Sequence, residues 1–235
     1  RDRLLRYGRL ISRFIKWPYR AFRRTTSPWR VGIPRGRSWR SAIPLSLHRS
    51  IMEATLRNRY RGVRMVCYPF DIALIMRVIS QTQPATVFEI GSCEGGRALW
   101  LADICDGHII SVDLKPPTRL PFHRIEFIEA DEANLPSWLL DQPHPWLIIN
   151  DASHRPENII KCLEFFAPSM RLGEFIIVED AFITELGVDR AWGGGPAPAI
   201  TQFLAKHPEF EIATDYCDFY GYNVTANPNG YLRRC

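Results

Sequence analysis

The sequence lacks several features that would assign it to common classes of protein. No uninterrupted apolar run approaches the roughly 20 residues that a spanning helix needs, so a transmembrane protein is not expected. The six cysteines are scattered and form no C-x-x-C pair, which argues against a zinc ribbon or a thioredoxin-like site. We interpret them as reduced thiols in a cytoplasmic protein. A phosphate-binding Gly-Lys-Ser/Thr loop and a G-x-G-x-x-G fingerprint are also absent.

Charge is distributed very unevenly along the 235 residues, of which 46% are hydrophobic. The net charge is +5, yet residues 1–64 contain 18 Lys and Arg against only Asp2 and Glu53. Residues 65–235 are therefore acidic. A chain of this length can bury one full core, and we predict a basic helical arm and linker over residues 1–64 and one main domain over residues 65–235. The first residue is Arg1, so the native start is expected upstream.

Residues 1–24 have the pattern of a basic amphipathic helix that is broken near Pro18. We favour packing of this helix on its own domain or on a second subunit, and therefore expect a homo-oligomer. The alternative is peripheral contact with the inner face of an anionic membrane, an interface that Trp17 and Tyr19 would suit. Nucleic acid is disfavoured, because no recognisable RNA-binding or DNA-binding module accompanies the arginines.

The rest of the chain alternates strand patterns with helical ones. This alternation predicts an α/β fold, a Rossmann-like, doubly wound and mostly parallel sheet covered by helices on both faces. Two further strands within residues 210–232 are expected to form a C-terminal antiparallel pair. The predicted strands are residues 87–90, 108–114, 124–128, 146–150 and 175–178, and the predicted helices are residues 69–80, 97–104, 157–170 and 197–206.

The turn after the first of these strands carries the main cofactor signal. It comprises Glu89, Gly91, Ser92 and Gly95 in the run Glu-Ile-Gly-Ser-Cys-Glu-Gly-Gly. Glycine at position 91 leaves room for a ligand on the backbone, and the amides at the start of the next helix face that ligand. An acidic residue two before the first glycine, with glycines four and five after it, resembles the S-adenosylmethionine loop of Rossmann-like methyltransferases.

Acidic residues follow several of the predicted strands, where doubly wound sheets bind their ligands. Asp113 lies 22 residues after Gly91 and is predicted to accept the ribose hydroxyls of an adenosine, with capping of a turn as the alternative. Glu89 is predicted to orient the methionine end of the cofactor, unless neighbouring groups satisfy it as a buried acid. Asp131 is predicted near the adenine, or is a solvated loop acid.

A second group of acids comprises Asp151, Glu179 and Asp180, which follow two other strands. If those strands are neighbours, the three carboxylates converge, and a hard divalent cation with oxygen ligands would relieve their repulsion. Mg²⁺ or Mn²⁺ fits better than zinc, because no cysteine or histidine cluster competes. The alternative is pairing with Arg155 or Arg190. His154 is either a general base for a substrate hydroxyl, a weak metal ligand or a structural loop residue.

Four ordered motifs resemble the cephalosporin hydroxylase and rhamnosyl O-methyltransferase family. The resemblance extends from about Pro69 to Arg234, and Arg97 stands where the family usually has a small Ser. The motifs are Glu89-Ile-Gly-Ser-Cys-Glu-Gly-Gly, Asn150-Asp-Ala-Ser-His154, Val178-Glu-Asp180 and Asn227-Pro-Asn-Gly-Tyr-Leu-Arg-Arg234. The resemblance implies a Rossmann-like methyltransferase fold, bound S-adenosylmethionine and a divalent cation on Asp151, Glu179 and Asp180.

Together these observations predict an S-adenosylmethionine-dependent, Mg²⁺-assisted O-methyltransferase for a sugar, glycolipid or other polyhydroxyl acceptor. His154 is predicted to accept the hydroxyl proton, and Asp151 to hold the cation that orients the hydroxyl. No pair of histidines with a carboxylate is spaced for an iron site, so methyl transfer is favoured over oxygen chemistry. The alternatives are a methyltransferase of antibiotic or other small-molecule biosynthesis, and a non-catalytic family member acting through the basic arm.

Overall fold

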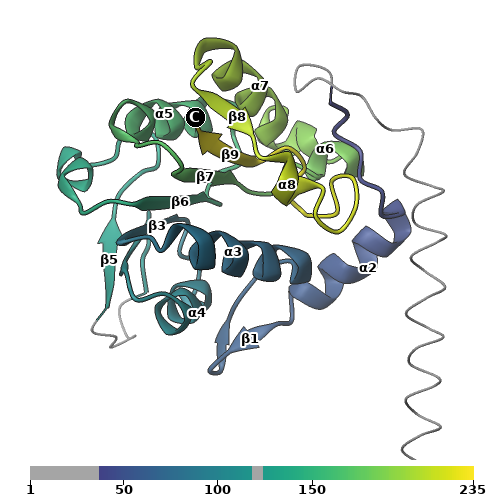
Figure 1. Ribbon diagram of the computed structural model, residues 1–235. Helices are drawn as coiled ribbons and strands as arrows, with labels where there is room; N and C mark the ends of the chain where they lie inside the picture. Colours follow the sequence, from purple (N-terminus) through teal and green to yellow (C-terminus); the bar gives the residue numbers. More distant parts are fainter. Residues whose placement is uncertain (1–36, 118–123) are drawn as a thin grey trace, which may run out of the picture. The chain divides into compact units, whose positions relative to one another are not determined.

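A seven-stranded sheet organises the part of the chain that the computed structural model describes, residues 37–117 and 124–235 (Figure 1). The strand order is β5-β4-β3-β6-β7-β9-β8, with β9 antiparallel to both neighbours and the other pairs parallel. The predicted mostly parallel α/β sheet is therefore confirmed. The strands are β3 (Thr86–Ile90), β4 (His108–Asp113), β5 (Ile125–Glu129), β6 (Trp146–Asn150), β7 (Phe175–Val178), β8 (Phe210–Ile212) and β9 (Tyr231–Arg234).

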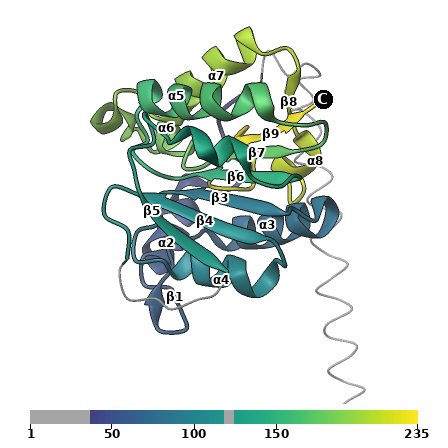
Figure 2. The ribbon, with the colours of Figure 1, turned by 90° about the vertical axis from the view of Figure 1, so that its left-hand side faces the viewer.

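The central strands are buried along their whole length, as their largely apolar sequences predict. Helices cover both faces of the sheet, with α3 and α4 on one side and α5, α6 and α7 on the other (Figure 2). Both layers therefore pack apolar side chains against the sheet. The helices are α2 (Leu45–Thr55), α3 (Pro69–Thr82), α4 (Gly96–Ile104), α5 (Pro156–Phe166), α6 (Ile183–Leu186), α7 (Pro196–Lys206) and α8 (Thr214–Cys217).

Strand β3 lies at the point where the order of the sheet reverses. The chain leaves β3 to form β4 on one side and returns to form β6 on the other. A reversal of this kind leaves a crevice beyond the carboxyl ends of the strands, where open α/β sheets bind ligands. The turn that begins at Gly91 and the loop that begins at Asp151 meet at this crevice.

The C-terminal strands form the antiparallel pair that the sequence predicts, joined by a long connection rather than a tight turn. Strand β9 lies between β7 and β8, and α8 is part of the connection. A short antiparallel pair, β1 (Arg59–Tyr60) and β2 (Val63–Arg64), was not predicted. Its two-residue strands are too short to give a periodic signal. Short 3₁₀ turns occur at Ser137–Asp141, Ala167–Ser169 and Asp189–Trp192.

One compact unit extends from Ser38 to Cys235. Ser38 connects the start of this unit to its C-terminal loop, because its carbonyl oxygen accepts hydrogen bonds from Asn223 and Asn229 and its N–H donates to the Tyr222 hydroxyl. The predicted amphipathic helix over residues 1–24 lies outside the described residues. The division into an arm of residues 1–64 and a domain of residues 65–235 therefore stays a prediction.

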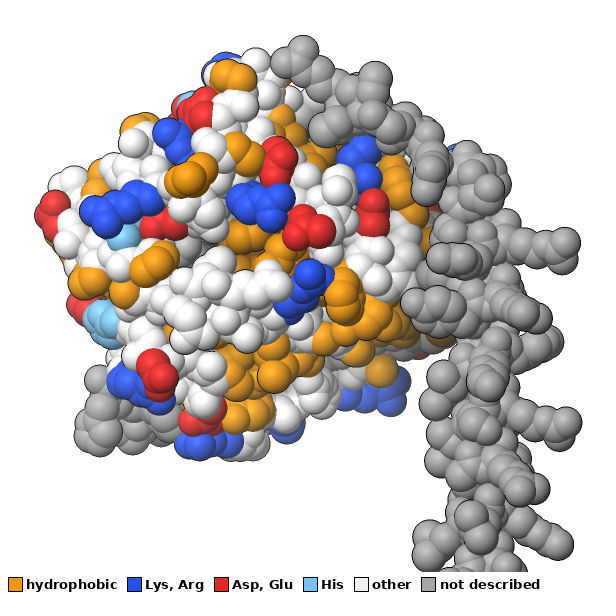
Figure 3. All heavy atoms as spheres, viewed as in Figure 1, with side chains coloured by type: hydrophobic (Ala, Val, Ile, Leu, Met, Phe, Trp, Pro, Cys, Tyr) orange, Lys and Arg blue, Asp and Glu red, His pale blue; other side chains and the backbone are white. Residues whose placement is uncertain are grey.

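Charged side chains of both signs are interspersed over the described part of the face seen in Figure 3. This mixed surface contrasts with the excess of basic residues in the first 64 positions of the sequence. Within the described ranges, none of the helices combines the length and the apolar character needed to cross a bilayer.

Candidate active site

Gly91 opens the turn at the end of β3 in a conformation that suits glycine, with φ 106°. A Cβ at this position would overlap the carbonyl oxygen of Asp151, because the backbones following β3 and β6 approach each other closely. The Asp151 N–H donates to Ile90 O at 2.8 Å in the same region. The close approach of the two backbones therefore requires glycine here, in addition to the room for a ligand that the sequence predicts.

Asp113 holds the glycine turn in place from the end of β4. Its carboxylate accepts hydrogen bonds from the N–H groups of Ser92 at 2.9 Å, Cys93 at 3.1 Å and Lys115 at 2.9 Å. Of the two roles expected from the sequence, capping of the turn is thus present in the structure. Oδ2 accepts two of these bonds and Oδ1 only one, so Oδ1 keeps a lone pair for a ribose hydroxyl, and that contact stays a prediction.

A cavity of about 360 Å³ lies beyond the carboxyl ends of β3, β4 and β6. Four of the residues singled out in the sequence line it: Gly91, Asp113, Asp131 and Asp151. The other predicted cofactor residues lie outside its lining. Glu89 and Ser92 are buried behind the turn, and Gly95 precedes the first residue of α4.

Glu132 lines the same cavity beside its neighbour Asp131, although only Asp131 was predicted to lie there. The Glu132 carboxylate is buried and accepts hydrogen bonds from Asn150 Nδ2 at 3.1 Å and from the Ser153 N–H at 3.0 Å. It therefore fixes the loop after β6 against the loop after β5. Asp131 is exposed and caps its own turn by accepting from the Ala133 N–H.

Arg97, in the first turn of α4, is surrounded by carboxylates in the interior. Its side chain is 5% exposed and lies 2.8 Å from Glu89 Oε1, 3.0 Å from Asp151 Oδ2 and 2.5 Å from Glu179 Oε2. Glu89 also accepts a hydrogen bond from the Ser111 hydroxyl. Glu89 is thus a buried acid satisfied by its neighbours, which was the alternative reading of this residue.

Burial dominates the protonation of this buried cluster. It raises the pKa of Glu89, against the opposing effect of Arg97 and Ser111. It raises the pKa of Glu179 well above the ordinary value, and the nearby Asp151 carboxylate adds to the rise while Arg97 opposes it. Glu179 Oε1 is buried without a hydrogen-bond partner among the described residues. A buried oxygen of this kind is normally satisfied by a proton, a water molecule or a cation.

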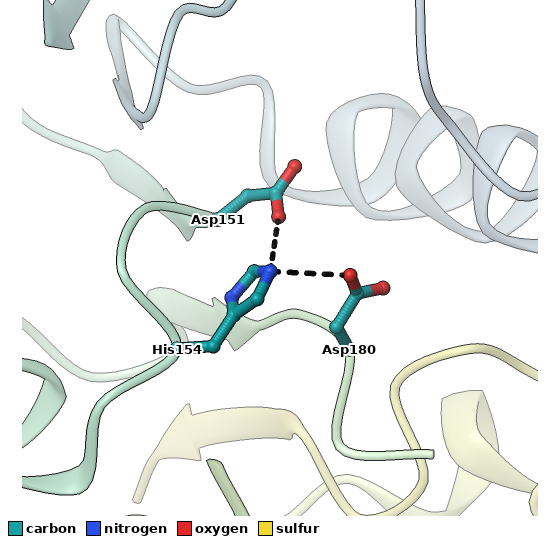
Figure 4. A group of neighbouring side chains, drawn as sticks. All are labelled: Asp151, His154 and Asp180. Atoms are coloured by element: carbon teal, nitrogen blue, oxygen red, sulfur yellow. Dashed lines mark ion pairs between the residues drawn. The ribbon is translucent and has the colours of Figure 1, made fainter. Parts of the chain in front are cut away.

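Asp151, His154 and Asp180 form a second group (Figure 4). His154 Nε2 lies 3.8 Å from Asp151 Oδ1 and 3.3 Å from Asp180 Oδ2. One ligand atom from each residue lies within 4.8 Å of the others, so the group can hold a metal ion. Burial disfavours the imidazolium, but the surrounding carboxylates outweigh that effect and raise the pKa of His154 to about 9.

The backbone of this group is held in an uncommon conformation. His154 and Asp180 have φ values of 55° and 60°, in the left-handed region that favours glycine. The Asp180 N–H donates to Asn227 Oδ1 at 2.9 Å, which anchors the residue to the C-terminal loop. Strained backbone of this kind concentrates at functional sites, where surrounding contacts maintain it.

The structure brings together most of the predicted metal ligands, with one rearrangement. Asp151 and Asp180 lie in the group with His154, whereas Glu179 is directed to Arg97. The predicted alternative partner Arg155 lies instead by Glu157, at 3.8 Å on the surface. Arg97 was visible in the sequence only as a departure from the family's small Ser, and its role in the carboxylate cluster was missed.

Comparisons with known proteins agree with this architecture. The sequence matches the family described as Rhamnosyl O-methyltransferase/CmcI over residues 53–235. It is 23% identical to the rhamnosyl O-methyltransferase of Mycobacterium tuberculosis H37Rv over 194 residues, which cover 76% of this chain and 78% of the relative. The rhamnosyl O-methyltransferase of Mycobacterium leprae is 24% identical over 194 residues, 74% of this chain and 82% of that one.

Two solved structures of CmcI share the fold. The apo form superposes with a TM-score of 0.60 at 22% identity, covering 76% of each chain. The form described as Mg-SAM has a TM-score of 0.60 at 21% identity, covering 77% of each chain.

The sheet order and the crevice at β3 define a Rossmann-like enzyme of the class I methyltransferase type. The family match covers most of the chain and adds the chemistry. The protein therefore belongs to the Rhamnosyl O-methyltransferase/CmcI family of S-adenosylmethionine-dependent O-methyltransferases.

Proposed function

We propose that the protein transfers a methyl group from S-adenosylmethionine to a hydroxyl of a sugar or other polyhydroxyl acceptor, with the assistance of a divalent cation. The observation that carries the proposal is the position of Asp151. This residue lines the cavity beside the glycine turn and also belongs to the group with His154 and Asp180. A donor in the cavity and an acceptor at the carboxylates would therefore meet at one residue.

The cavity suits the donor in both size and chemistry. Its 360 Å³ lies in the range of small-molecule sites, and Asp113, Asp131 and Glu132 offer oxygens to hydroxyl and amino groups. Asp113 would bind the ribose from the end of β4, and Asp131 would lie near the adenine. S-adenosylmethionine supplies the reactive methyl group on a positively charged sulfur, which an acidic cavity favours electrostatically.

The second group suits a hard cation such as Mg²⁺ or Mn²⁺. The carboxylates of Asp151 and Asp180 are the oxygen ligands that these ions prefer, and the buried Glu179 lies nearby with an Oε1 that has no hydrogen-bond partner among the described residues. A bound cation supplies Lewis acidity, which lowers the pKa of a ligated hydroxyl and orients it.

His154 would remove the proton from the acceptor hydroxyl. Its pKa of about 9 means that the imidazole is protonated near neutral pH, because the Asp180 and Asp151 carboxylates, with a further contribution from Glu179, stabilise the imidazolium. It becomes a base when another positive charge compensates those carboxylates, because the imidazolium then loses its stabilisation. The same carboxylates would hold the ring in the orientation needed for proton transfer.

The name of the curated relatives supports a sugar hydroxyl as the acceptor. The test is transfer of a labelled methyl group from S-adenosylmethionine to a panel of rhamnosides, other glycosides, glycolipids and phenolic compounds. Methylation of glycosides is the expected result. Methylation of phenolics alone would favour small-molecule biosynthesis, and absence of transfer to any acceptor would favour the non-catalytic alternative.

A further inference from the structure

Arg97 already provides a positive charge among the carboxylates of the site. Its guanidinium contacts Glu89, Asp151 and Glu179 from a position that is 5% exposed, and its Nη2 lies 3.3 Å from Gly91 O. The arginine thus connects the cavity-lining turn to the carboxylates beyond β6 and β7. Its planar fork matches several oxygens at once, which a lysine or a serine cannot do.

The contact with Arg97 determines where the Glu179 carboxylate lies. Oε2 is held at 2.5 Å from Arg97 Nη1, and Glu179 is not in the group that Asp151, His154 and Asp180 form. Asp151 is shared, because Oδ2 lies 3.0 Å from the same Nη1 while Oδ1 is on the side of His154. One side of Asp151 is therefore neutralised before any cation binds.

We propose that Arg97 is a positioning residue that withholds Glu179 from the cation and thereby weakens the metal site. The cation is held by Asp151 and Asp180 beside His154, with Glu179 acting as the partner of Arg97. Two effects lower the affinity: a carboxylate ligand is lost, and a buried guanidinium repels a divalent ion across a few ångströms of protein. This inference rests on the proposed function, since it concerns the cation that assists methyl transfer.

The experiment measures the affinity of the full chain for Mn²⁺ alone, by electron paramagnetic resonance of the free ion. Glu179→Gln should change the affinity by less than about threefold, because this carboxylate is not a ligand. The matched substitution of a ligand, Asp180→Asn, should weaken binding by about tenfold or more. Arg97→Ser should strengthen it by about tenfold or more, because Glu179 is released and a repelling charge is removed.

A double-mutant cycle then isolates the link between the two residues. In the Arg97→Ser background, Glu179→Gln should reverse most of the gain in Mn²⁺ affinity. A merely structural role for Arg97 would lower the affinity in the single variant and would leave the two substitutions without this coupling. Arg97→Lys should retain most of the weak binding of the unsubstituted chain, since it keeps the charge.

Each outcome decides the proposal. A loss of Mn²⁺ binding in Glu179→Gln as large as that in Asp180→Asn overturns it, and this pair suffices if circular dichroism shows that Arg97→Ser does not fold. Failure of the unsubstituted chain to bind Mn²⁺ also overturns it. Binding of S-adenosylhomocysteine, measured in parallel by calorimetry, shows whether the donor part of the proposed function stands independently.

Discussion

Arg97 Nη1 lies 3.0 Å from Asp151 Oδ2, and this ion pair joins the two halves of the site. Arg97 belongs to the helix that follows the glycine turn, whereas Asp151 follows the neighbouring strand β6 and faces His154 with its other oxygen. Both side chains contact further carboxylates, so a change at either residue alters the charge of the whole cluster.

Asp151→Asn should separate cation binding from donor binding. The substitution retains the shape of the side chain but removes the charge shared by Arg97 and His154, so Mn²⁺ affinity should fall by about tenfold or more. Methyl transfer should fall by about a hundredfold. S-adenosylhomocysteine affinity should change much less, because the other lining acids remain. Calorimetry and labelled methyl transfer measure these effects, with Asp141→Asn on an exposed turn as the control.

Equal losses of donor and cation affinity in Asp151→Asn would contradict the division of the site into two halves. Unchanged Mn²⁺ affinity would remove Asp151 from the cation site.

Gly91→Ala should destabilise the protein strongly. The new Cβ would overlap the Asp151 carbonyl oxygen and would also require alanine at φ 106°. Gly62→Ala is the matched control, because its φ of 81° imposes backbone strain but no atom of residues 37–117 and 124–235 lies within 4 Å of the added Cβ. Urea unfolding should show a loss of about 1 kcal/mol for Gly62→Ala and at least several kcal/mol for Gly91→Ala.

A similar small loss in both glycine variants would show that the close approach of the two backbones is relaxed easily. In that case the rigidity attributed to the turn would be wrong.

Asp71 should make stability depend on pH. It is buried at the start of α3, where burial raises its pKa to about 7 against hydrogen bonds from Thr225, Tyr231 and the Ala226 N–H. The folded protein therefore binds this proton more tightly than the unfolded chain. The stabilisation is complete below the unfolded pKa, near 4, and is lost as pH rises to about 7, with an upper limit of about 4 kcal/mol.

Urea unfolding from pH 4 to pH 8 measures this dependence on Asp71. The difference between the unsubstituted protein and Asp71→Asn should change over that range and level off above pH 7. Asp106→Asn, at a fully exposed position, is the control. A constant difference between the unsubstituted protein and Asp71→Asn would show that Asp71 is ionised throughout.

Local sequence patterns were sufficient to predict the strands and helices around the glycine turn. The sequence shows a strand pattern over residues 87–90, glycines from Gly91 onward and then a helical pattern. These segments follow one another directly along the chain, so their periodicity can be recognised without knowledge of the fold. The acids at strand ends were predictable for the same reason, because parallel strands bring their carboxyl ends to one edge. Asp113 and Asp151 accordingly line the crevice.

The partners of these acids depend on long-range geometry. Arg97 meets Asp151 and Glu179 only because β3, β6 and β7 are neighbours in the sheet, and a linear pattern does not contain that pairing. Which of Asp131 and Glu132 faces the interior likewise depends on the backbone conformation of a loop. Glu132 points inward to Asn150, and no periodicity in a loop indicates this.

Asp113→Ala should weaken donor binding by about tenfold or more, since the glycine turn loses its three hydrogen bonds to the carboxylate and the ribose loses an acceptor. Asp113→Asn keeps one oxygen and should retain part of the affinity. Calorimetric titration with S-adenosylhomocysteine measures both variants. Unchanged binding in Asp113→Ala would place the donor elsewhere.

The central claim is that the cavity at the end of β3 binds the methyl donor. Calorimetric titration of the full chain with S-adenosylmethionine, in the presence and absence of Mg²⁺, tests it most directly. One molecule should bind per chain, and its binding should protect Cys93, which lines the cavity, from a thiol-modifying reagent. Absence of binding by the folded protein under both conditions, with Cys93 modified at an unchanged rate, would contradict the account.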